Sequence, residues 1–138
     1  MFGFDSDSVK SVKKAAANPV NNFDMDDASV EHHEGNDVCG DYIRVYLKID
    51  DNGIVENYSY NGCSSTFVLG GASIIVDDIK GKNISQLLEL DYTIYKGKGL
   101  EFSNTRQIRQ LSLSILSVRN AIHNYLNDGI IDELEDLY

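Results

Sequence analysis

Two cysteines and one aspartate are the residues of this 138-residue chain best suited to hold a metal. Cys39 and Cys63 are its two thiols, and Asp41 follows Cys39 by two positions. Residues i and i+2 of an extended segment point to the same side, so Cys39 and Asp41 are expected to share a face. Thiolates and carboxylates bind zinc, and thiolates hold iron–sulfur clusters. The three side chains are therefore the candidate site.

A predicted β-hairpin brings the two cysteines together. Aliphatic residues at every second position predict a strand over residues 43–49. Residues 50–53 form a turn cluster that ends in Asn-Gly, and residues 54–61 are rich in β-formers. The midpoint between Cys39 and Cys63 falls in this turn, at Asp51. Antiparallel pairing therefore places Cys39 nearly opposite Cys63, at the roughly 4.5–5.5 Å of directly paired residues.

Local chemistry around the thiols supports a site but leaves alternatives open. Gly40 and Gly62 flank the cysteines and allow the backbone to approach an inorganic centre closely. Cys63 also precedes a predicted helix, whose N-terminal dipole favours thiolate. From the residues alone, a pair of packed thiols and a fortuitous disulfide are the competing interpretations.

Periodicity and capping residues predict the remaining elements. A first helix begins near residue 7 or 8 and ends at Asn18-Pro19, and residues 20–37 read as irregular. Helices are predicted over residues 64–80, 85–90, 105–126 and 131–137. Gly70 and Gly71 lie inside the first of these, where they would permit close packing of that helix. The order predicts one α+β domain over residues 1–138, with residues 1–8 and 128–138 peripheral.

Charge and hydropathy exclude several classes of partner. The chain has 12 basic and 22 acidic residues, a formal charge of −10, which disfavours nucleic acid and anionic membrane surfaces. No stretch reaches the roughly 18 apolar residues that span a bilayer. The first ten residues resemble neither a secretory signal nor a transit peptide. The expected location is cytoplasmic, and a basic protein surface is the more plausible partner.

The sequence resembles the iron–sulfur cluster assembly scaffold family, of the IscU and NifU N-terminal domain type, over residues 9–126. The resemblance is carried by Val38-Cys39-Gly40-Asp41, Arg44-Val45-Tyr46-Leu47-Lys48-Ile49, Gly62-Cys63-Ser64-Ser65 and Lys80-Gly81-Lys82. It implies a three-stranded antiparallel sheet with helices packed on one face. It also implies a non-catalytic scaffold that binds iron or a [2Fe–2S] cluster through Cys39, Asp41 and Cys63. Sulfur would come from a cysteine desulfurase, the cluster would pass to acceptor proteins, and zinc could take its place.

The chain departs from that family in the last long helix. The family carries a third cysteine there, usually after a histidine, whereas this chain has Ser112 and Leu113. A zinc ion or a [2Fe–2S] cluster takes four ligands, and this pocket offers three. A homodimer could share one cluster through Cys39 and Cys63 of each copy. A loop histidine, His32 or His33, could also substitute.

Three functions follow from these residues. The first is a scaffold in which Asp41 completes the ligand set weakly, which favours release over storage. The second is a cluster-free paralogue that binds and regulates a desulfurase or a sister scaffold. The third is a zinc-dependent sulfurtransferase that carries a persulfide on Cys63 or Cys39.

Overall fold

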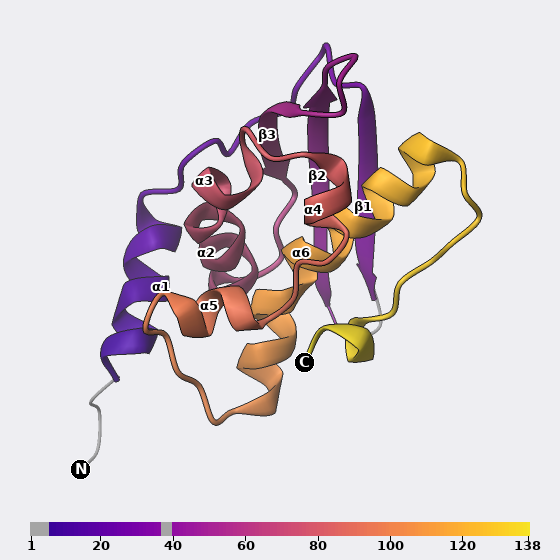
Figure 1. The fold of residues 1–138 in the computed structure, drawn as a ribbon. Helices are drawn as coiled ribbons and strands as arrows, with labels where there is room; N and C mark the ends of the chain where they lie inside the picture. The colour runs from indigo at the N-terminus through magenta and orange to yellow at the C-terminus, as the bar shows by residue number, and fades with distance from the viewer. Residues whose placement is uncertain (1–5, 37–39) are drawn as a thin grey trace.

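Three antiparallel strands form a single sheet in the order β1–β2–β3 (Figure 1). The strands are β1 (Val30–Asn36), β2 (Asp41–Ile49) and β3 (Val55–Asn61). This computed structural model describes residues 6–36 and 40–138. The predicted α+β class, with a three-stranded antiparallel sheet, is confirmed.

The central strand is β2, because its alternating aliphatic residues give the sheet an apolar face. Ile43, Val45 and Leu47 are fully buried on the face that the helices cover. Tyr46 points the other way but is also buried, and its hydroxyl donates a hydrogen bond to Asp24 Oδ1 at 2.9 Å. The segment before β1 therefore lies against the outer face, and the helices pack on the inner one (Figure 1).

Helices supply the rest of the core. In chain order they are α1 (Asp7–Ala17), α2 (Thr66–Ile74), α3 (Val76–Ile79), α4 (Ile84–Leu87), α5 (Thr93–Gly97), α6 (Thr105–Leu126) and the 3-10 helix η1 (Leu134–Leu137). α6 packs on β1, β2 and α2, so it lies between the sheet and the other helices. Its N-cap is Asn104, whose side chain accepts from Gln107 N, and it ends at Asn127 with φ of 53°. None of the helices within the described part of the chain could span a bilayer.

Three local predictions were wrong. Residues 20–37 were expected to be irregular, but β1 pairs along β2 from Val30–Leu47 to Asn36–Asp41. Its polar sequence carries little signal because an edge strand needs few apolar side chains. The helix expected over residues 64–80 is split at Ile75, where φ and ψ are −92° and 5°. The helix expected over residues 131–137 is the shorter η1.

Gly70 sets the distance between α1 and α2. A Cβ atom at Gly70 would lie 2.5 Å from the carbonyl oxygen of Val12, which is well inside van der Waals contact. Gly71, on the next position, faces Tyr95 and Leu111 at 3.0–3.1 Å in the same way. The predicted close packing of this helix is confirmed, and it lets α1 lie directly on α2.

Candidate functional site

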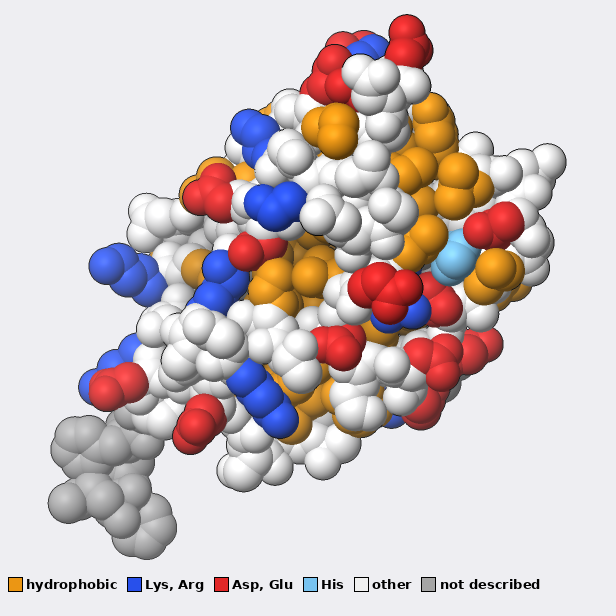
Figure 2. Space-filling model, in the orientation of Figure 1, with side chains coloured by type: hydrophobic (Ala, Val, Ile, Leu, Met, Phe, Trp, Pro, Cys, Tyr) orange, Lys and Arg blue, Asp and Glu red, His pale blue; other side chains and the backbone are white. Residues whose placement is uncertain are grey.

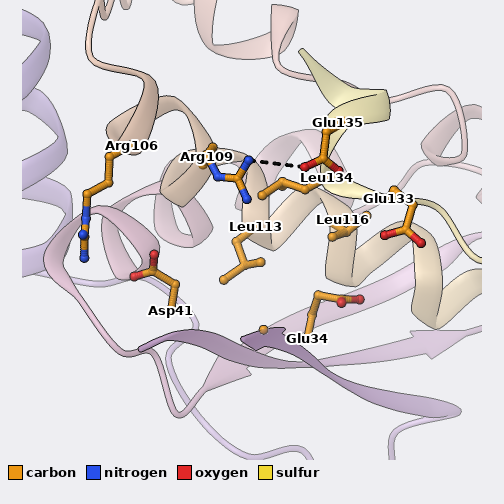
Figure 3. Close-up of a pocket in the computed structure, with 10 residues that line it drawn as sticks. Glu34, Asp41, Arg106, Arg109, Leu113, Leu116, Glu133, Leu134 and Glu135 are labelled. Carbon is orange, nitrogen blue, oxygen red and sulfur yellow. Dashed lines mark hydrogen bonds and ion pairs between the residues drawn. The ribbon is translucent and has the colours of Figure 1, made fainter. Parts of the chain in front are cut away.

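Asp41, the first residue of β2, lines a cavity of about 460 Å³. The strands form its floor, α6 forms one wall and the C-terminal segment forms another (Figure 3). Its lining residues are Glu34, Gly35, Asp41, Arg106, Arg109, Leu113, Leu116, Glu133, Leu134 and Glu135. The cavity therefore joins residues as far apart in the chain as Glu34 and Glu135.

Leu113 lines the same cavity as Asp41. Its side chain is 5% exposed and projects from α6 toward the sheet (Figure 3). Gln110, one turn earlier on α6, donates a hydrogen bond from Nε2 to Asp41 Oδ1 at 3.1 Å. Ser112 is fully buried, and its hydroxyl donates to Ile108 O at 2.8 Å. Of the two departures from the expected ligand pattern, Leu113 thus faces Asp41, whereas Ser112 bonds within its own helix.

Cys63 lies two residues beyond the end of β3. The following residue, Ser64, donates its N–H to Tyr42 O at 3.1 Å, and Tyr42 donates its own to Ser64 Oγ at 2.9 Å. The β2–β3 register pairs Arg44 with Asn61, so its extension brings Cys63 level with Tyr42 rather than with Cys39. The register differs from the expected one because the turn is centred on Asn52 rather than Asp51, as the Ile49–Val55 pair shows, and because a shift between Lys48 and Ile49 adds one more residue.

The thiol of Cys63 belongs to a second hollow, of about 600 Å³. Its lining residues are Lys13, Ala16 and Ala17 of α1, with Cys63, Ser64, Ser65, Thr66 and Leu69. Asp41 is not among them, so these two predicted site residues line separate hollows. Cys39 lies outside the described residues, and its convergence with Cys63 and Asp41 stays a prediction. Within residues 6–36 and 40–138 no three metal-binding side chains are grouped.

Burial governs the acidity of Cys63. Desolvation raises the pKa of its thiol to about 12. The N-terminus of α2, which was expected to favour thiolate, begins three residues later at Thr66 and does not offset this effect. At neutral pH Cys63 is therefore a protonated thiol, and a metal ion would have to displace the proton to bind.

We expect iodoacetamide to modify Cys63 far more slowly than it modifies an exposed cysteine. At pH 7.5 its thiolate fraction should be smaller by roughly three orders of magnitude than that of a cysteine with an ordinary pKa of about 8.5. The rate, followed by mass spectrometry of the Cys63 peptide, should still be rising at pH 10. The same chain in urea is the control, and a plateau near pH 9 in the folded protein would contradict the prediction.

The histidines proposed as substitute ligands do not line the cavity of Asp41. His32 Nε2 lies 2.8 Å from Glu34 Oε2, and its Nδ1 lies 3.0 Å from the side-chain amide of Asn124. The ring of His33 packs near that of Tyr42, with centroids 6.1 Å apart. Both rings are thus engaged elsewhere, which leaves the site without a described substitute for the missing ligand.

Three cavity residues of α6, namely Arg106, Arg109 and Leu116, were not predicted from the sequence. Together with Leu113 they recur at intervals of three to four along α6, and this spacing could have revealed a shared face. No comparable signal marks Glu133 to Glu135, because only the tertiary fold brings the C-terminal segment to the cavity.

Comparison with known sequences gives a consistent result. The family described as NifU-like N terminal domain matches residues 8–129. The iron–sulfur cluster assembly scaffold protein IscU 1 of Archaeoglobus fulgidus is 28% identical over 122 residues, which cover 87% of this chain and 78% of the relative. The IscU scaffold of Haemophilus influenzae is 35% identical over 54 residues, 38% of this chain and 41% of that protein.

Solved structures share the fold. The N-terminal part of a NifU-like protein from Brucella abortus aligns with a TM-score of 0.64 at 17% identity, covering 88% of this chain and 94% of that one. A SufU-type putative scaffold from Fervidobacterium islandicum aligns with a TM-score of 0.65 at 13% identity, covering 86% and 96%. At these identities the likeness shows the arrangement of elements.

Proposed function

The chain belongs to the NifU-like N-terminal domain family, and we propose that it is a non-catalytic scaffold for iron–sulfur cluster assembly. The observation that carries the proposal is the placement of Leu113 beside Asp41 in one cavity. The position at which the resemblance expects a third cysteine faces a predicted ligand, which supports a site at this place that lacks one donor. Such a scaffold would hold its cluster weakly and pass it on readily.

Cys39, Asp41 and Cys63 are the proposed ligands for iron or an assembling [2Fe–2S] cluster, which is cargo rather than a resident cofactor. Sulfur would be supplied by a cysteine desulfurase, and acceptor proteins would take the finished cluster. Gln110 fixes one carboxylate oxygen of Asp41 by its hydrogen bond, which leaves the second oxygen for a metal. Two copies could complete the ligand set by sharing one cluster.

The second candidate is a cluster-free paralogue that binds and regulates a desulfurase or a sister scaffold. It is favoured by the same leucine, since Leu113 supplies no donor, and by the separate hollows of Asp41 and Cys63. The sulfurtransferase alternative is less favoured, because a persulfide carrier needs a reactive thiolate and burial raises the pKa of Cys63 to about 12.

Anaerobic reconstitution with ferrous iron and sulfide tests the proposal. We expect visible absorption and bound iron and sulfide in the unmodified chain, and the loss of both in Cys39→Ser and Cys63→Ser. Ser103→Ala, at an exposed position outside both hollows, is the control and should bind like the unmodified chain. A colourless, iron-free protein that still changes desulfurase turnover would reject the scaffold in favour of the regulator.

A further inference from the structure

The C-terminal segment covers the cavity that contains Asp41. Glu133, Leu134 and Glu135 form the wall that faces Asp41 and Leu113 across the cavity (Figure 3). All other lining residues come from β1, β2 and α6. Within residues 128–138, which were expected to be peripheral, Glu133, Leu134 and Glu135 close this site.

The segment is fixed to the C-terminal half of α6 at Asp132. Asp132 Oδ2 accepts hydrogen bonds from Arg119 Nε at 2.9 Å and His123 Nε2 at 3.0 Å. The side chain of Asn120 accepts from Asp132 N at 2.8 Å and donates to Asp132 O at 3.1 Å. The Arg119 and Asp132 side chains are mostly buried. This first anchor therefore combines a shielded ion pair with main-chain bonds.

The second anchor, beyond the cavity, is weaker. Leu137 is 2% exposed, and its carbonyl accepts from Tyr92 N at 2.9 Å. Arg109 lies 3.3 Å from Glu135 and 2.9 Å from the hydroxyl of Tyr138. The Arg109 and Glu135 side chains are 46% and 68% exposed, and ion pairs in water contribute little. The far end is thus held by one buried apolar side chain, one main-chain hydrogen bond and the exposed contacts of Arg109.

We propose that residues 133–138 are a strap that pivots at Asp132 and lifts away to open the cavity. Between the two anchors, Glu133, Leu134 and Glu135 contact the cavity without a main-chain bond to α6 or the sheet. The strap and its surroundings are acidic, as Figure 2 shows for the face around the C-terminal segment. A basic partner surface would therefore compete with Arg109 for the strap and expose Asp41. The role of Asp41 as a ligand rests on the proposed function, whereas the lifting of the strap does not.

Thiol accessibility at position 113 tests the strap without iron. The reporter is Leu113→Cys, and the measurement is the rate at which its new thiol reacts with iodoacetamide, read from its own peptide. Adding Leu137→Ala should raise that rate about tenfold, because it removes most of the apolar contact at the weaker anchor. Adding Arg109→Gln should raise it by a smaller factor of about two to five.

Two controls isolate the motion. Ile131→Ala truncates a side chain of the same segment that is 75% exposed, and it should leave the reporter rate unchanged. The rate at Cys63 should be unchanged in every variant, since that thiol lies in the other hollow. Equal reporter rates in all folded variants would overturn the proposal, as would an equal rise in Ile131→Ala.

The test remains decisive if one variant is damaged. Should Leu137→Ala lose its cooperative thermal unfolding, Arg109→Gln decides the outcome by itself. An unchanged reaction rate at position 113 would reject the strap without bearing on cluster assembly, because no step of the measurement involves iron or sulfide. Failed reconstitution with a responsive reporter would instead reject the scaffold and retain the strap.

Discussion

Leu113→Cys is expected to make the reconstituted protein retain its cluster much longer. The substitution places a thiol in the cavity beside Asp41, at the position where the resemblance expects a ligand. A fourth protein ligand should slow cluster loss on the order of tenfold or more, since clusters are held by four donors. The decay of visible absorption after addition of an iron chelator measures this lifetime.

Leu116→Cys is the matched control for that experiment. Leu116 lines the same cavity one turn further along α6 and is similarly buried, so the substitution adds the same group at a different place. It should leave the lifetime of the cluster unchanged. Equal stabilisation by both variants would show that any added thiol suffices. No stabilisation by Leu113→Cys would place the cluster outside the cavity of Asp41.

Asp132→Ala is expected to destabilise the fold by about 3 kcal/mol at pH 7, because it leaves Arg119 and His123 without their shared carboxylate. Urea unfolding followed by circular dichroism measures the change. Asp51→Ala, in the exposed turn after β2, is the matched control and should stay within about 0.5 kcal/mol of the unmodified chain. Equal losses in the two variants would contradict the role given to Asp132.

The effect of Asp132→Ala should also depend on pH. Burial alone would raise the pKa of Asp132, but hydrogen bonds from Arg119 and His123 outweigh it and bring the pKa below its usual 3.8. The carboxylate therefore stabilises the fold fully above the unfolded pKa of about 3.9, and this contribution is lost as pH falls through the lower folded value. The difference between the variant and the unmodified chain should shrink below about pH 4.

The sequence predicted those elements whose side chains alternate or recur on one buried face. β2 was predicted because Ile43, Val45 and Leu47 are packed against helices, and α6 was predicted from its apolar stripe. β1 was not predicted because its contacts to β2 and α6 are made largely by backbone and polar groups. One example is the hydrogen bond that Ser117 Oγ donates to His32 O. Such an edge strand is specified by its neighbours.

The candidate site was predictable in part. Asp41 and the departure at Leu113 were both identified from the sequence, and the structure brings them to one cavity. The position of Cys63 depended on the register of the ribbon, which was altered by a turn centred on Asn52 and by a shift at Lys48 and Ile49. The strap was not predictable, because Asp132 and Leu137 find their contacts on α6 and near Tyr92 only after the chain has folded.

The contact between Gly70 and Val12 has a consequence for the reactivity of Cys63. By letting α1 lie directly on α2, it brings Ala16 and Ala17 to the hollow that contains Cys63. Detachment of the N-terminal helix would hydrate the thiol and lower its pKa, although nothing bonded to Cys63 had changed. The packing of α1 on α2 therefore influences whether this sulfur is a protonated thiol or a nucleophilic thiolate.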